Sequence, residues 1–142
     1  MATATQENKN PLWLTTIIVA ISTTIIGTAL RMITGAISSS APEPAYFPLL
    51  YLIVAFVSTL AIVIAYGMVS PLLPRGWLLK GFIVGIFLFI MGDLPYALIT
   101  GYGTNMSGMV ARNMVIAAAL NRLINGFILA YTYQRFSTPK DS

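Results

Sequence analysis

"ALNRLINGFILAY" (residues 119–131) decides the class of fold, because this stretch is apolar enough for lipid and yet carries a charge at its centre. It belongs to an apolar run over 109–133, and a helix needs only about 20 such residues to cross the hydrocarbon core of a bilayer. Arg122, with Asn121 and Asn125 beside it, is too polar to face lipid. The stretch therefore predicts a membrane-spanning helix that turns these side chains toward other helices.

The composition of the whole chain supports a membrane protein. Its 142 residues are 57% hydrophobic and 8% charged, whereas an ordinary soluble domain is about 25% charged. A chain this short cannot hide so much apolar surface in a water-soluble core. We therefore predict a multi-pass integral membrane protein with a single domain over residues 1–142.

Three further apolar runs lie before the run at 109–133, at 12–37, 46–69 and 77–100. In lipid the backbone must satisfy its own hydrogen bonds, so runs of this length are expected to be helices. The connections between the runs are short and rich in Pro or Gly, at 38–45, 70–76 and 101–108. Short connections place consecutive helices side by side and antiparallel. The predicted fold is an all-α, four-transmembrane-helix antiparallel bundle.

Short sequence matches recur at an offset close to 65 residues. "WL" occurs at 13–14 and 77–78, and "ITG" occurs at 33–35 and 99–101. One interpretation is two copies of a helical hairpin in the same orientation. The other is chance, because isoleucine-rich helices match one another easily, and the sequence leaves both open.

Basic residues predict the orientation in the membrane. Lys and Arg are concentrated at the N-tail, the 70–76 connection with its flank, and the C-tail, as Lys9, Arg75, Lys80, Arg135 and Lys140. The opposite connections carry Arg112 and Glu43. Cytoplasmic loops carry an excess of Lys and Arg. Both termini are therefore expected on the cytoplasmic side.

Asp93 and Arg122 are the candidate intramembrane ion pair. Arg122 lies near the middle of its run, and Asp93 lies four residues past the middle of the preceding one, or about 6 Å toward the outer side. Side chains on a helix lean toward its own N-terminus, so in antiparallel helices these two lean toward each other. Asp93 is also the one carboxylate of the chain in an apolar segment.

Two other arginines have no obvious partner. Arg31 lies within the apolar run at 12–37, toward its outer end, and Arg112 lies at the mouth of the run at 109–133. With Arg122 they outnumber the single carboxylate in the apolar segments. Arg31 either extends to the outer headgroups or meets an anion outside the chain, such as a lipid phosphate or a carboxylate of a partner subunit.

A polar stripe follows the fourth run, in which Asn113, Ala117, Asn121 and Asn125 are spaced by four residues. This spacing keeps side chains on one helix face. Hydrogen bonding to neighbouring helices is the favoured interpretation, because no second polar stripe is evident opposite it. The alternative is a polar cavity or pathway.

Small residues mark candidate contacts between helices. Gly81 and Gly85 form a GxxxG pattern, which allows close helix approach either within the bundle or in a dimer. Gly27 is the corresponding small residue on the first run. Pro95 removes a backbone hydrogen bond and is expected to kink the third helix just past Asp93.

The residues leave little equipment for catalysis. The chain has no Cys and no His, so thiolate or imidazole metal sites and nucleophile–histidine chemistry are excluded within it. We expect no cofactor and no enzymatic activity. The net charge of +4 is scattered and does not form the basic face of a nucleic-acid-binding protein.

Two functions fit this pattern. The first is a non-catalytic membrane subunit or interaction protein of a larger complex, whose partners are lipids and other membrane subunits or a second copy of itself. The second is an oligomeric small transporter or channel component, with a polar site built on Arg122, Asp93 and the asparagines.

Overall fold

The computed structural model describes residues 11–34, 48–103 and 108–137, and within these ranges it is helical without any strand. Four helical segments, between 20 and 30 residues long, are long and apolar enough to cross a membrane. The elements are α1 (Pro11–Thr34), α2 (Pro48–Val69), the 3₁₀ turn η1 (Ser70–Leu72), α3 (Trp77–Leu88), the π-helical segment η2 (Phe89–Asp93), α4 (Leu94–Gly103) and α5 (Gly108–Ser137).

The helix limits differ from the expected ones in two places. The third helical segment continues to Gly103, so the connection that was expected at 101–108 is shorter. The fourth continues past residue 133 to Ser137, with Arg135 in its last turn. A basic side chain there interacts favourably with the carbonyl end of the helix dipole, which favours this extension.

The turn between α2 and α3 is closed by Lys80. Its Nζ donates to the main-chain oxygen of Ser70 at 2.8 Å and to the Ser70 hydroxyl at 3.0 Å. The ammonium group thereby satisfies a carbonyl just past the end of α2. Gly76 adopts φ 102°, a backbone conformation that favours glycine. The loop residues thus fix how α3 starts.

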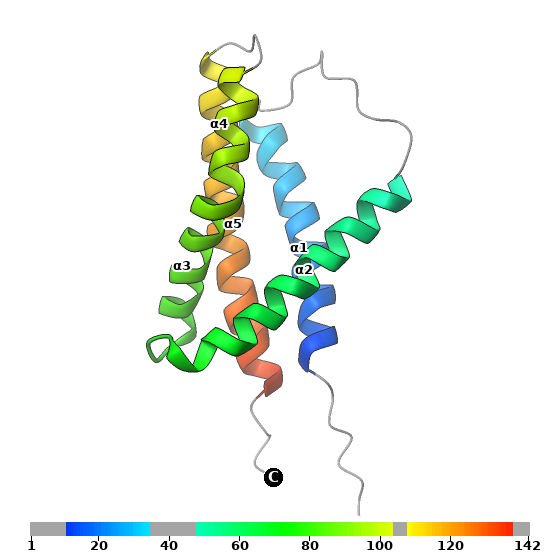
Figure 1. Ribbon diagram of the computed structural model, residues 1–142, viewed down its shortest axis with the longest axis vertical. Helices are drawn as coiled ribbons and strands as arrows, with labels where there is room; N and C mark the ends of the chain where they lie inside the picture. The colour runs from blue at the N-terminus through cyan, green and yellow to red at the C-terminus, as the bar shows by residue number, and fades with distance from the viewer. Residues whose placement is uncertain (1–10, 35–47, 104–107, 138–142) are drawn as a thin grey trace, which may run out of the picture.

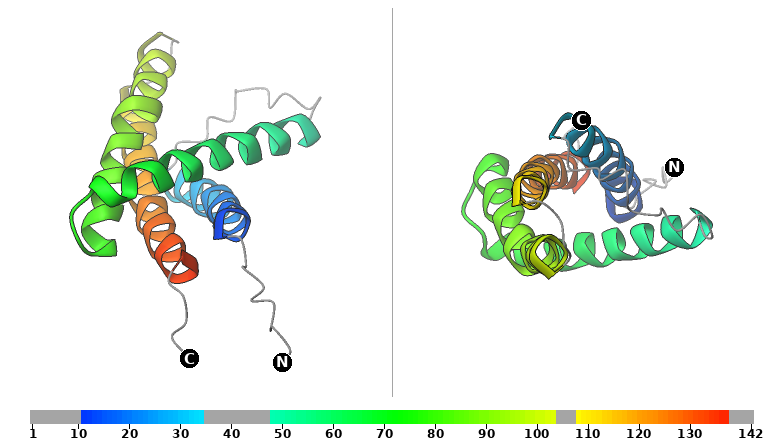
Figure 2. Two further views of the ribbon diagram at one scale, coloured as in Figure 1. Left: turned by 60° about the horizontal axis from the view of Figure 1, so that its bottom comes forward. Right: turned by 90° about the horizontal axis from the view of Figure 1, so that it is seen from above.

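Helix α5 is the centre of the arrangement. It packs against α1 and against both α3 and α4, and these helices run side by side in Figures 1 and 2. α2 does not lie parallel to them but crosses obliquely, and its N-terminal half extends away from the others. α1, α5 and the continuous segment α3–η2–α4 therefore form a group of three, and α2 is attached to this group at one end.

Glycines bring α3 against α5. A Cβ added at Gly81 would lie 2.7 Å from the Cα of Phe127, and one added at Gly85 would lie 2.9 Å from the main-chain oxygen of Arg122. A Cβ at Gly126 would overlap the main-chain oxygen of Gly81. The GxxxG pattern of α3 is therefore used within the chain.

The apolar core joins α1, α2 and α5 at one end. Its buried side chains are Val19, Val63, Tyr66, Leu129 and Ala130. The two tyrosine rings Tyr66 and Tyr133 meet edge to face, with centroids 5.2 Å apart. α2 thus contributes its C-terminal half to the core, whereas Ile53, Val54 and Val57 in its other half are exposed.

The two helical hairpins do not share one arrangement. α3 and α4 lie along α5, whereas α2 diverges from α1 (Figure 1). In the second hairpin, formed by α3–α4 and α5, glycines of α3 and α5 face each other at close range. Among the described residues, α1 and α2 have no matching glycine contact. The sequence matches at an offset near 65 residues are thus not accompanied by a common hairpin geometry.

Gly126→Ala is expected to lower the free energy of unfolding by about 1–3 kcal/mol, because the added methyl group overpacks the α3–α5 seam. The matched control is Gly92→Ala, since a Cβ there meets nothing within 4 Å. Unfolding of both variants in mixed micelles, titrated with SDS and followed by circular dichroism, measures the difference. Equal stability of the two variants would contradict the close approach of α3 and α5.

Candidate functional site: a polar layer between the central helices

The structure contains the ion pair that the sequence predicts. Arg122 Nε lies 2.5 Å from Asp93 Oδ2, and Arg122 Nη2 donates to Asp93 Oδ1 at 2.8 Å. Two parallel bonds between a guanidinium and a carboxylate form the strong bidentate arrangement. Each side chain keeps 24% of its surface exposed, so the pair is half-buried and one edge of it is open.

The backbone geometry explains why the two charges meet. Gly85 places α3 directly against the main chain of Arg122, and α3 and α5 run antiparallel from this contact. Asp93 then lies further along α3–α4 in the direction in which the Arg122 side chain leans. The glycine contact sets the spacing, and the long arginine side chain spans the remaining distance.

Asp93 is the last residue of the π-helical segment η2. The N–H of Leu94 donates to the carbonyl of Phe89, five residues earlier, so the hydrogen-bond ladder is widened directly before Pro95. Proline has no N–H to offer the carbonyl of residue 91 and its ring crowds that carbonyl. A wide turn relieves both effects. The expected disturbance at Pro95 therefore takes the form of a π turn that carries the carboxylate.

The asparagines of α5 face α1. Asn125 is 3% exposed, and its Oδ1 accepts a hydrogen bond from the Ser22 hydroxyl at 2.9 Å. Its Nδ2 donates to the main-chain oxygen and the Oδ1 of Asn121 at 2.7 and 2.8 Å. Asn121 in turn packs on Gly27, where an added Cβ would lie 3.1 Å from Asn121 Nδ2.

The stripe continues to the other end of α5. Asn113 Nδ2 donates to the main-chain oxygen of Thr34 at 2.7 Å, and Ala117 is buried between these two levels. The contacts of Asn113, Asn121 and Asn125 therefore all lie at the α1–α5 interface or within α5. They match the hydrogen-bonding interpretation of the stripe.

The sequence reasoning missed the groups on the facing helices. Ser22 is the partner of Asn125, and Gly126 is the partner of the glycines on α3. The sequence signal for this interface on α1 was its small residues Ser22, Gly27 and Thr34, which are spaced by five and then by seven residues. No pattern within α1 says that these residues oppose the asparagines, because the antiparallel register belongs to the pair of helices.

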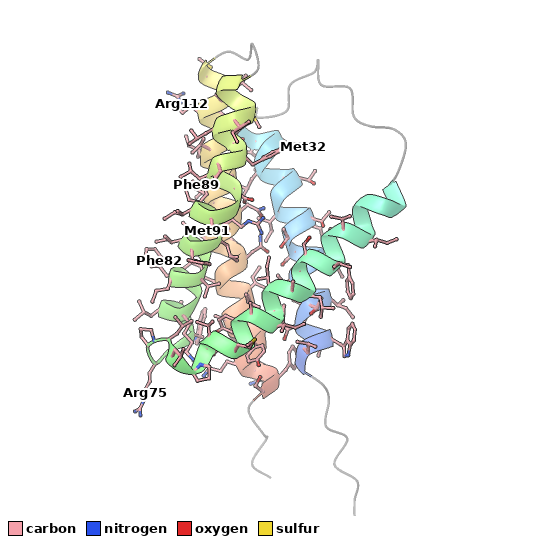
Figure 3. All side chains as sticks on the ribbon, in the orientation of Figure 1. Met32, Arg75, Phe82, Phe89, Met91 and Arg112 are labelled. Carbon is pink, nitrogen blue, oxygen red and sulfur yellow. The ribbon has the colours of Figure 1, made fainter. Side chains whose placement is uncertain are left out.

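The remaining candidate residues lie apart from this layer. Arg112 is exposed and projects away from the helices, at the opposite end of the molecule from Arg75 (Figure 3). Arg31 belongs to α1, but its side chain lies outside the described residues. Pro95 is exposed, so it acts on the course of its own helix and does not pack between helices.

The chemistry of the layer is that of helix association. It joins η2 to α5 by charge and α1 to α5 by amide and hydroxyl groups. Within the described ranges, no group of three or more His, Cys, Asp or Glu side chains lies close enough to hold a metal ion. What the layer offers beyond its own bonds is the open edge of the Asp93–Arg122 pair.

Comparison of the chain with protein families, with curated proteins and with solved structures gives no match. The function is therefore argued from the geometry alone.

Asp93→Asn is expected to lower the free energy of unfolding by about 3–5 kcal/mol, because it leaves Arg122 as an uncompensated charge. The double variant Asp93→Asn with Arg122→Gln should recover part of this loss, since two amides can pair without charge. Arg112→Gln is the control, because an exposed substitution changes stability by about 0.5 kcal/mol or less. SDS titration of the parent chain, of the single variants Asp93→Asn and Arg122→Gln and of the double variant gives the coupling energy of the pair. Additive effects of the two substitutions would contradict a direct interaction.

Proposed function

We propose that this protein is a multi-pass integral membrane protein without catalytic activity, which works as an interaction subunit of a larger membrane assembly. The proposed domain is the single four-helix unit of residues 1–142. The observation that carries the proposal is the half-attached helix α2, which joins the core through Val63 and Tyr66 and leaves its other half uncovered.

Insertion in a bilayer is supported by length and surface. Every candidate span is 20 residues or longer, and at most 28% of the apolar 18-residue window in any span is buried inside the protein. Large apolar side chains on the outer faces are strongly exposed, for example Ile33 at 81% and Met68 at 75%. Exposed apolar area of this extent marks membrane or protein contact, and four spans of this length favour the membrane.

An interaction role is favoured because the diverging half of α2 meets α1 through Phe56, which stacks on Trp13, and leaves Ile53 and Val57 exposed. An apolar groove of about 520 Å³ separates this half from α1, lined on the α1 side by Ile17, Ile21 and Ile25 and on the α2 side by Ile53, Phe56 and Val57. Helices in membranes are held by close packing and by polar contacts. A further helix beside α2 would supply packing that the chain itself does not provide.

Transport is the second candidate, and the half-buried Asp93–Arg122 pair is the observation in its favour. A polar route also needs groups that are free to bind a solute. Asn113 and Asn125 are instead hydrogen-bonded to α1, and Asn121 accepts a bond from Asn125. The described asparagines thus serve the helix interface, which favours the subunit function.

The proposed orientation, with both termini in the cytoplasm, is testable because the chain has no natural cysteine. Arg75 and Arg112 are exposed at opposite ends of the molecule (Figure 3). A membrane-impermeant maleimide added to intact cells should label Arg112→Cys and leave Arg75→Cys unlabelled, with the reverse result in inside-out vesicles. Labelling of both variants from one side would show that the helices do not span the membrane as proposed.

The subunit function is tested by the native size of the assembly. The full chain, tagged and extracted with a mild detergent from the cells that produce it, is expected to elute with a different membrane protein in fixed stoichiometry. Mass photometry and quantitative mass spectrometry of the same fraction measure the ratio. A chain that elutes alone as a monomer would overturn the subunit function, and a stoichiometric homo-oligomer whose thermal stability rises with small anions would favour transport.

A further inference from the structure

The guanidinium of Arg122 has unused hydrogen-bond donors. An arginine carries five N–H donors, and the bonds to Asp93 use Nε and one hydrogen of Nη2. Nη1 donates to no other residue in the described part of the chain. Thr15 Oγ1 is the one fully enclosed polar side-chain atom there that lacks a partner, so Nη1 is not enclosed. Three donors therefore remain at the open edge of the pair.

This open edge lies on the face of α5 that α2 covers elsewhere. Leu129 and Tyr133 follow Arg122 by seven and eleven residues, which places all three on one helix face. Val63 and Tyr66 of α2 pack over Leu129 and Tyr133. α2 crosses the other helices obliquely and its N-terminal half extends away from them (Figures 1 and 2), and the ion pair keeps 24% of each side chain exposed.

The depth of Arg122 limits what can satisfy these donors. Arg122 lies at the middle of the 30-residue α5, and the polar headgroups begin about 15 Å from the centre of a bilayer, half the thickness of its hydrocarbon core. Lipid tails offer no acceptor, and an unpaired polar group in hydrocarbon costs several kcal/mol. The acceptor must therefore come from water or from a protein side chain at the same depth.

The surroundings favour a protein side chain over water. A buried water needs about two to four polar partners. The nearby amide and hydroxyl groups of Asn125 and Ser22 are already bonded to one another or to Asn121. The Asp93–Arg122 pair is therefore the partly exposed polar group whose donors are unused, which suits a helix that carries one acceptor.

We infer that the open edge of the Asp93–Arg122 pair binds a membrane helix of a different protein, which places a neutral acceptor, an amide or a hydroxyl side chain, on the free N–H groups of Arg122. A neutral group is preferred because Asp93 already balances the charge of Arg122. This inference rests on the proposed subunit function and adds the place of the contact and the chemistry of the partner.

The test uses the mild-detergent complex and two variants that act in different ways. Asp93→Asn with Arg122→Gln keeps an amide pair and removes the guanidinium. Ala118→Trp leaves the ion pair intact and places a bulky ring one helical turn from Arg122, on the same face. Ile116→Trp is the matched control, because Ile116 is 44% exposed on another face of α5. The maleimide labelling pattern of each variant shows whether it inserts as the parent chain does.

Both test variants are expected to lower recovery of the partner by about tenfold or more, the loss that accompanies one charge-assisted hydrogen bond, while Ile116→Trp retains it. Retention of the partner by both test variants overturns this inference and leaves the subunit function standing. Absence of any stoichiometric partner from the parent chain overturns the subunit function, and this inference with it. If the partner is a second copy of this chain, the assignment to a different protein is overturned.

Water is the remaining occupant, and a separate measurement addresses it. Ala118→Cys, in the otherwise cysteine-free chain, is expected to resist a charged, membrane-impermeant thiol reagent in the intact complex and to react once the complex is dissociated. Rapid reaction in the intact complex would show a water-filled opening and would overturn the inference.

Discussion

The charge of Arg122 at the middle of α5 is the constraint on which the rest of the structure depends. An unpaired arginine at a helix centre costs about 2.5–3.5 kcal/mol on insertion scales, so its partner has to lie within reach of one side chain. Asp93 meets that need from the neighbouring helix, with two bonds of 2.5 and 2.8 Å. The short distance between the helices then requires residues without side chains at the crossing, and Gly81, Gly85 and Gly126 supply them.

On the side of α5 that faces α1, hydrogen bonds set the register of the two helices. Interhelical hydrogen bonds in membranes contribute only about 0.6 kcal/mol each on average, so Ser22–Asn125 and Thr34–Asn113 add modestly to stability. They matter because apolar faces can slide past one another, whereas donors and acceptors match in few registers. The close packing of Asn121 on Gly27 adds a steric constraint on the same register. Polar contacts thus set the register of α1 on α5, and an ion pair joins η2 to α5.

α2 is packed on the other helices along only part of its length. Its C-terminal half contributes Val63 and Tyr66 to the core, whereas its other half contacts α1 through the stacked rings of Phe56 and Trp13 and leaves Ile53 and Val57 exposed. The divergence of α2 leaves both an apolar groove and an uncovered ion pair. Among the described residues, the central helices leave the Thr15 hydroxyl and part of the Arg122 guanidinium without a partner, and the surface beside α2 is where we propose a neighbour.

The sequence by itself determined the four apolar helices, the pairing of Asp93 with Arg122 and the inward direction of the asparagines, because the bilayer that we propose as its solvent permits little else for long apolar runs and for charges within them. Only the tertiary structure decided that Gly126 faces the GxxxG of α3, that Ser22 faces Asn125, and that Pro95 produces a π turn. It also decided that α2 crosses the other helices instead of completing a bundle. These features depend on the register and crossing of two helices, and a periodic pattern within one helix carries no information about where its neighbour lies.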